Sequence, residues 1–226
     1  MVAVPKTWVM KREVSARSSD KTEDGPYYLI GAPQREFEDG KIILASGEEL
    51  QKNSPLLLTL HIRGPSGEPV KNAQFDWWQA DTAGVYSTST YMLRGKFKTN
   101  EQGDIEILTV VPGKYGPADH RRAGHMHLIL TDPDGKFSEL TTQLYVCRGN
   151  DSSEMNTDFL NFIRSTRPSN MLHCWTTKED FMDLPKLSSD DAGMLEIIKW
   201  WNTTLAELGV NAAVIAGAEA EIRMNA

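Results

Sequence analysis

Two of the chain's five histidines, His125 and His127, stand two residues apart in the stretch "RRAGHMHLIL". Successive side chains of a β-strand point to opposite faces, so residues i and i+2 project side by side from one face. Two neighbouring imidazoles that both carried a charge would repel each other, and burying them without a partner costs free energy. A bound metal ion explains the pair, and two hydrogen-bonded core histidines are the simpler alternative.

Two tyrosines stand where predicted strands give way to loops, Tyr86 in "DTAGVYSTS" and Tyr115 in "VPGKYGPADH". Either one alone is normally a packing or surface residue. A phenol, with a pKa of about 10, loses its proton to a strongly Lewis-acidic cation, and the hard Fe(III) ion prefers anionic oxygen ligands. Two phenolates and a hydroxide would neutralise ferric iron, and the two imidazoles would complete its coordination. A zinc or copper protein using the same histidines is an alternative, although neither metal ordinarily needs two phenolates.

The elements that must position these side chains are short strands in the middle of the chain. They are expected at residues 56–63, 73–80, 96–99, 104–111, 125–131 and 139–146. The connections "DTAG", "NEQG" and "DPDG" each end in a glycine, which tolerates the positive φ of tight turns. Many short strands with turn signals and no helix between them predict an antiparallel β-sandwich core.

The two ends of the chain differ from this middle. We expect an N-terminal extension at 1–24, the β-sandwich core at 25–150 and a helical C-terminal extension at 151–226 that packs on the core. Helices are expected at 151–164 and 190–209. In the second helix, apolar residues recur at spacings of three and four, at Met194, Ile197, Trp201, Leu205 and Leu208. This stripe indicates packing within the protomer, with a subunit contact as the alternative. The fold class expected is mainly β, with short helical extensions at both ends.

Composition excludes several classes of protein. Hydrophobic residues make up 40% and charged residues 24%, as in soluble globular proteins, and no apolar run is long enough to span a membrane. A net charge of −7 without a basic cluster argues against nucleic acid as a partner. The start of the chain does not resemble a secretory signal, so a cytoplasmic location is expected. The two cysteines, Cys147 and Cys174, form no C-x-x-C motif, which argues against a thiolate zinc site.

Five fragments between about Gly25 and Gly149 are similar to one known family, in its order and at similar spacings. They are "GPYYLIGAP", "WWQADTAGVYS", "LRGKFKTNEQGDIEILTVVPGKYG", "RRAGHMH" and "LTTQLY". The chain resembles the intradiol ring-cleaving dioxygenases, in particular their catechol- and hydroxyquinol-cleaving members, with a shortened N-terminal region. The resemblance implies a non-haem Fe(III) enzyme. It would use O2 to cleave a catechol-type ring between its two hydroxylated carbons, giving a cis,cis-muconate-type dicarboxylate.

The resemblance also implies the roles of individual residues. One Fe(III) per chain would be bound by Tyr86, Tyr115, His125 and His127. Tyr115 would leave the metal when the substrate binds, and Tyr86 would stay. Arg122 would stabilise the anionic ring, and the catalytic set would be Arg122, Tyr115 and Gln143. The substrate, a small aromatic diol, would contact Pro26, Tyr27 and Arg122.

Other assignments stay open at this point. A catalytically silent β-sandwich of the same family, acting as a binding module, would share the sequence pattern. A homodimer is expected if the helix at 190–209 supplies a subunit contact. The sequence does not identify the substituents of the ring.

Overall fold

The computed structural model describes residues 7–8, 19, 21–22, 24–53, 55–117, 121–147, 158 and 168–226. Its elements are, in chain order, β1 (Thr7–Trp8), β2 (Lys41–Ile43), α1 (Gly47–Lys52), β3 (Pro55–Arg63), β4 (Gln74–Gln79), β5 (Arg94–Lys98), β6 (Asp104–Val110), β7 (His125–Thr131), β8 (Leu140–Cys147), the 3-10 helix η1 (Pro168–Asn170), β9 (Met171–Thr176), β10 (Lys186–Leu187), α4 (Ala192–Glu207) and β11 (Ala216–Arg223). Each strand expected in the middle of the chain is present, as β3 to β8.

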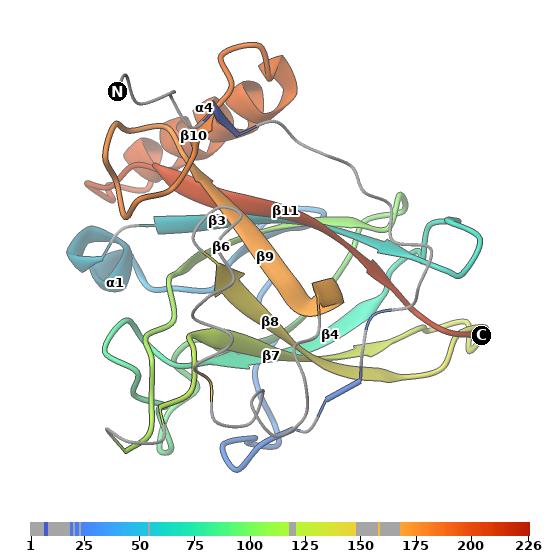
Figure 1. Ribbon diagram of the computed structural model, residues 1–226. Coiled ribbons are helices and arrows are strands. Elements are labelled where there is room, and N and C mark those ends of the chain that lie inside the picture. Colours follow the sequence, from blue (N-terminus) through green and yellow to red (C-terminus); the bar gives the residue numbers. More distant parts are fainter. Residues whose placement is uncertain are drawn as a thin grey trace.

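The strands form one 11-stranded sheet, in which β2-β6-β3-β11-β9-β8-β7-β4-β5 are neighbours in that order. The sheet is nearly closed into a barrel-like shape (Figure 1). The prediction of a mainly β fold is confirmed. The prediction of an antiparallel β-sandwich core is wrong, because the strands form one mixed sheet in which β2 pairs with β6, β3 with β11 and β8 with β9 in parallel. Parallel neighbours need long connections, and here their partners come from distant parts of the chain.

The C-terminal part of the chain supplies strands as well as a helix. β9 and β11 lie between β8 and β3 in the sheet, so residues beyond 150 share the sheet with the predicted core. The helix expected at 190–209 is confirmed as α4, whose N-cap Asp191 accepts a hydrogen bond from the backbone N–H of Met194. The helix expected at 151–164 lies outside the described residues, apart from Asp158. Of the expected N-terminal extension, Thr7–Trp8 form β1, which pairs with β10. The domain boundaries stay a prediction.

The apolar stripe of α4 packs inside the protomer. Met194 and Leu205 are buried, and Trp201 has no exposed surface and donates from Nε1 to Glu106 Oε2 at 2.6 Å. The same cluster contains Leu57 of β3 and other residues from the sheet. Intramolecular packing is therefore the correct interpretation for Met194, Trp201 and Leu205, whereas Leu208 is 50% exposed, and the homodimer stays a prediction.

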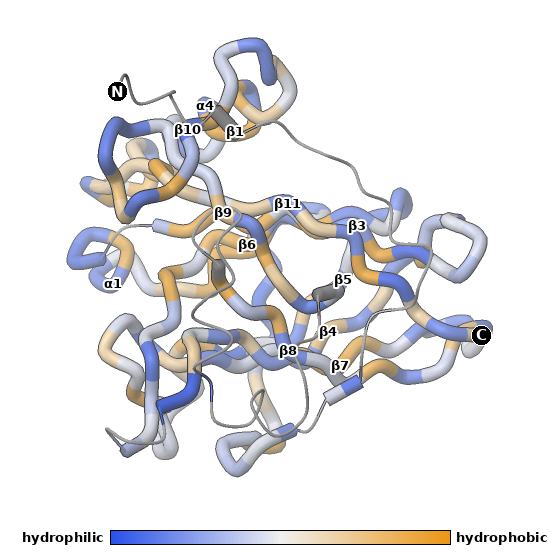
Figure 2. Tube along the Cα trace, in the orientation of Figure 1, coloured by the Kyte–Doolittle hydropathy of each residue, from blue (hydrophilic) through white to orange (hydrophobic). Residues whose placement is uncertain are grey.

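A second and larger cluster fills the interior of the sheet. It contains Leu58 and Leu60 of β3, Trp77 of β4 and Leu128 of β7, all essentially unexposed. Figure 2 shows hydrophobic residues along the strands and hydrophilic ones in the loops that join them. Among the described residues, no helix is long and apolar enough to cross a membrane.

Candidate metal centre

His125 and His127 project from the same face of β7 and are both buried. Their Nε2 atoms lie 3.1 Å apart. His125 Nδ1 lies 2.7 Å from the carbonyl oxygen of Ala123, which can only accept, so Nδ1 carries the proton and Nε2 offers its lone pair. Burial, together with the nearby charge of Arg122, lowers the pKa of His125 to about 3, so its imidazole is neutral. The indole of Trp78, on the neighbouring β4, stacks on His127 at 4.9 Å between ring centroids.

The two tyrosines reach the same place from separate loops. Tyr86 follows β4 and Tyr115 follows β6, and their ring centroids lie 5.2 Å apart. Tyr115 lies 5.4 Å from the ring of His125, and Tyr86 lies 6.2 Å from that of His127. The structure thus brings together all four side chains expected to bind the metal.

The surroundings of both phenols keep them in the protonated form when no metal is present. Burial raises the pKa of Tyr86 far above its usual range. Burial also raises the pKa of Tyr115, although the charge of Arg122 opposes the effect. The Tyr86 hydroxyl is buried, and in the part of the chain that the structure describes it has no hydrogen-bond partner.

The loops that carry these residues are packed backbone against backbone. Gly84, before Tyr86, has φ of +83°, and a Cβ there would lie 2.2 Å from the carbonyl oxygen of Lys114. A Cβ at Gly124 would lie 2.2 Å from the carbonyl oxygen of Pro112. Only glycine allows such an approach, so these two positions hold the Tyr86 loop, the Tyr115 loop and the start of β7 in contact.

Arg122 is buried beside the cluster. Its Nη1 donates to Tyr115 Oη at 3.2 Å, and its Nη2 donates to Gln143 Oε1 at 3.0 Å and to Tyr145 Oη at 2.8 Å. Its Nε pairs with the carboxylate of Asp158 at 2.9 Å. One nitrogen of the guanidinium therefore contacts a candidate metal ligand while the others are held by polar side chains.

Sequence reasoning did not identify Tyr145 or Asp158. Tyr145 lies two residues beyond Gln143 on β8, and the same i, i+2 rule that paired the histidines could have found it. Asp158 lies 36 residues after Arg122, and no local pattern connects the two.

Of the three residues expected to contact substrate, Pro26 and Tyr27 lie in the segment 24–36, and Arg122 is the arginine described above. Tyr27 stacks on Tyr86 with ring centroids 4.5 Å apart and meets Tyr115 edge-on at 5.9 Å. Pro26 is exposed in the same turn. Figure 1 shows this segment in blue at the end of the molecule away from α4. Tyr27 therefore packs against both tyrosines of the cluster, and Pro26 precedes it in the turn.

The residues present fit a ferric ion. Two nitrogen ligands about 2.1 Å from one metal ion, at a right angle, lie about 3 Å apart, as the two Nε2 atoms do. The buried Tyr86 hydroxyl supplies an oxygen without a protein partner among the described residues. Two imidazoles with two phenols give nitrogen and anionic oxygen donors, which suit hard trivalent iron. The described residues contain no group of three or more His, Cys, Asp or Glu that could hold a metal, so a metal ion at this cluster would need the tyrosines as ligands.

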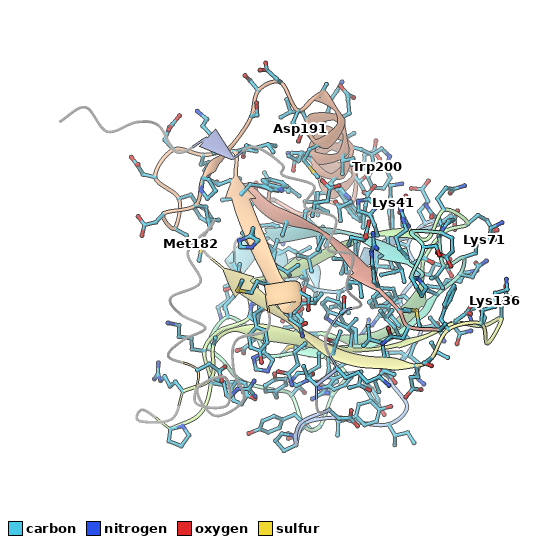
Figure 3. The ribbon with its side chains drawn as sticks, turned by 45° about the vertical axis from the view of Figure 1, so that its right-hand side comes forward. Lys41, Lys71, Lys136, Met182, Asp191 and Trp200 are labelled. Atoms are coloured by element: carbon cyan, nitrogen blue, oxygen red, sulfur yellow. The ribbon has the colours of Figure 1, made fainter. Side chains whose placement is uncertain are left out.

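A separate cleft of about 570 Å³ lies beside α4. Its lining includes Lys41, Glu106 and Trp200, and Lys41 Nζ lies 4.8 Å above the Trp200 ring. Figure 3 labels these two residues next to each other. None of the four candidate ligands lines this cleft, so it is not part of the candidate metal centre.

Comparison with known proteins shows which family and which relatives this chain is similar to. A family model described as "Dioxygenase" matches residues 23–184. Catechol 1,2-dioxygenase 1 of Acinetobacter lwoffii is 28% identical over 159 residues, which cover 60% of this chain and 49% of that protein. An intradiol ring-cleavage dioxygenase of Aspergillus niger is 30% identical over 145 residues, covering 54% of this chain and 43% of that protein. The chain spans about half the length of these relatives.

Solved structures show the same fold. Catechol 1,2-dioxygenase of Acinetobacter radioresistens superposes with a TM-score of 0.66 at 20% identity, covering 92% of this chain and 63% of that one. Hydroxyquinol 1,2-dioxygenase of Pseudomonas putida gives a TM-score of 0.63 at 20% identity, covering 94% and 68%. At this identity the likeness concerns the fold.

Proposed function

The chain belongs to the intradiol ring-cleavage dioxygenase family, and on that basis we propose that it is a non-haem Fe(III) enzyme that cleaves a catechol-type ring. Cleavage occurs between the two hydroxylated carbons, consumes O2 and yields a cis,cis-muconate-type dicarboxylate. The observation that carries the proposal is the buried cluster of Tyr86, Tyr115, His125 and His127, with the two Nε2 atoms 3.1 Å apart.

The four residues would hold one iron per chain. His125 and His127 contribute neutral imidazoles, and the two tyrosines lose their protons on binding. When bound, Fe(III) would supply the Lewis acidity that draws electron density from a catecholate ring and makes the ring reactive towards O2. Because burial raises the pKa of both phenols, their deprotonation depends on the metal charge, and iron binding releases protons.

The two tyrosines have different surroundings, which supports different roles. Tyr115 Oη accepts a hydrogen bond from Arg122, which can stabilise the phenolate and also the phenol after it leaves the metal. Tyr115 would thus leave on substrate binding and take a substrate proton. The Tyr86 hydroxyl has no such donor among the described residues, so its charge depends on remaining bound to iron.

The remaining residues act on the substrate. The Arg122 guanidinium, buried and permanently charged, would stabilise the anionic ring in a site from which water is largely excluded. Gln143 holds this guanidinium through Oε1. Tyr27 and Pro26 would line the aromatic pocket and limit the size of ring substituents.

The proposal is tested on the purified protein. We expect one iron per chain and a red to burgundy colour from phenolate-to-iron charge transfer. Oxygen uptake and product mass with catechol, hydroxyquinol, protocatechuate and alkyl- or halocatechols then identify the substrate. A colourless, iron-free protein that stays inactive after iron reconstitution would reject the proposal in favour of a silent binding module. Zinc or copper in place of iron would reject it in favour of another metalloprotein.

Variants of the tyrosines test their roles. Tyr86→Phe should lose most of the iron or its colour. Tyr115→Phe should keep iron with an altered spectrum, because water or hydroxide can fill a position vacated in each turnover, while ring cleavage slows strongly. Tyr91→Phe is a matched control, since Tyr91 Oη donates only to the backbone of Ile30 in the described contacts. Normal turnover by Tyr115→Phe, or full iron and unchanged spectra in both variants, would show that these tyrosines are not ligands.

A further inference from the structure

The carboxylate of Asp158 holds two parts of the candidate metal centre at once. It has no exposed surface. Its Oδ1 and Oδ2 lie 2.9 and 3.0 Å from Arg122 Nε, and Oδ2 also accepts from the backbone N–H of Ala123 at 2.9 Å. One buried anion thus contacts both the side chain of residue 122 and the peptide that follows it.

The contact with Arg122 controls where the guanidinium points. A guanidinium is planar and its donors have fixed directions, so anchoring Nε restricts the directions of Nη1 and Nη2. Nη2 is held further by Gln143 and Tyr145, which leaves Nη1 directed at Tyr115 Oη. A guanidinium without Asp158 could rotate away from Tyr115 while keeping its charge.

The contact with Ala123 reaches the first histidine. Asp158 accepts from the N–H of Ala123, and the carbonyl of the same residue accepts from His125 Nδ1 at 2.7 Å. That second bond sets the tautomer in which Nε2 is free to bind a metal. Asp158 therefore fixes the backbone that orients this imidazole.

We infer that Asp158 is a positioning residue that sets the Arg122 guanidinium against Tyr115 and the backbone behind His125. The inference rests on the proposed function for its consequence in catalysis, since Arg122 and Tyr115 act there on the substrate. The structural part of the inference rests on the contacts alone. A carboxylate that only neutralised a buried charge would not need to contact the Ala123 peptide.

The structural part is tested on the metal-free protein by NMR. The Arg122 Nε–H proton should exchange slowly with solvent in the wild type and rapidly in Asp158→Asn, and the Ala123 amide signal should shift. Asp104→Asn is the matched control, because Asp104 also pairs with an arginine, Arg63, at 2.6 Å but on another part of the sheet. The control should leave both signals unchanged. Rapid exchange in the wild type would overturn the inference, and this measurement decides even if Asp158→Asn does not fold.

The catalytic part is tested by a double-mutant cycle on the iron-loaded protein. Asp158→Asn should reduce kcat by about 10- to 100-fold, as loss of supporting contacts to a metal site typically does. Asp158→Asn should slow Arg122→Gln by less than it slows the wild type, because the part of its effect that acts through the arginine is already lost and only the part through the Ala123 backbone remains. Additive losses, or an unchanged kcat in Asp158→Asn, would overturn the inference. A wild-type protein that cleaves no catechol would reject the proposed function, while the NMR result would still decide the structural part.

Discussion

Replacing Tyr86 by phenylalanine should stabilise the metal-free protein while it abolishes most iron binding. Tyr86 is buried, with 7% of its surface exposed, and its hydroxyl has no hydrogen-bond partner among the described residues. A buried polar group without a partner costs about 1–3 kcal/mol. Removing the oxygen recovers part of this cost, and the small void it leaves reduces the gain. We therefore expect a net gain of about 1 kcal/mol.

The assay is urea and thermal unfolding of the metal-free protein, with iron content measured on a separate iron-loaded sample. A gain of about 1 kcal/mol corresponds to a rise in Tm of roughly 2–4 °C for a chain of this size. Tyr28→Phe is the control, because Tyr28 Oη donates to Asp76 Oδ2 at 2.8 Å and its loss should cost about 1 kcal/mol. If Tyr86→Phe destabilises the metal-free protein as much as Tyr28→Phe does, the hydroxyl has a partner without iron and the reasoning fails.

Three further predictions concern stability. The hydrogen bond to Asp104, with a second to Glu219, raises the pKa of His61 to about 9, so its contribution is complete below pH about 6.5 and is lost as pH rises through 9. Urea unfolding at pH 6 and pH 10 should show a loss of about 1–2 kcal/mol, because water screens this partly exposed pair. Gly124→Ala should lower the free energy of unfolding, measured by urea unfolding, by about 3 kcal/mol, because the added Cβ would clash with the Pro112 carbonyl oxygen. Trp201→Asp should give insoluble protein in a solubility assay, because it places a charge in the core.

Matched variants control these predictions. His61→Gln should flatten the pH profile, and an unchanged profile would assign the loss to another group. Gly193→Ala, where the nearest atom to a Cβ is 3.9 Å away, should be neutral or slightly stabilising, so equal losses at both glycines would contradict the packing argument. Leu208→Asp, at a residue that is 50% exposed, should stay soluble, and a folded Trp201→Asp would place that residue outside the core.

The features that the sequence predicted are those set by short-range rules. The two-residue period of a strand is enough to place His125 and His127 on one face, and the glycine turns are enough to separate β3 to β8. The tyrosines were candidates because the charge of a ferric ion demands anionic oxygen. Their approach to the histidines was implied by the family resemblance, since sequence spacing alone does not bring two separate loops together.

The features that were missed depend on contacts between distant residues. The insertion of β9 and β11 between β8 and β3 depends on tertiary pairing that local preference does not determine. Asp158 is an ordinary polar residue in its local stretch, and its role follows only from its contact with Arg122. The parallel strand pairs of the sheet also depend on contacts between distant parts of the chain.

The contact of loop backbones at Gly84 and Gly124 limits how this protein can diversify. An inserted or deleted residue in the Tyr86 loop would push on the Tyr115 loop and on the start of β7 together, so these segments cannot change length one at a time. The segment 24–36 packs against the cluster through Tyr27 and takes no part in the backbone contacts at Gly84 and Gly124. If the proposed function holds, selection for new ring substituents, in nature or in a mutant library, should therefore accumulate its changes in segment 24–36.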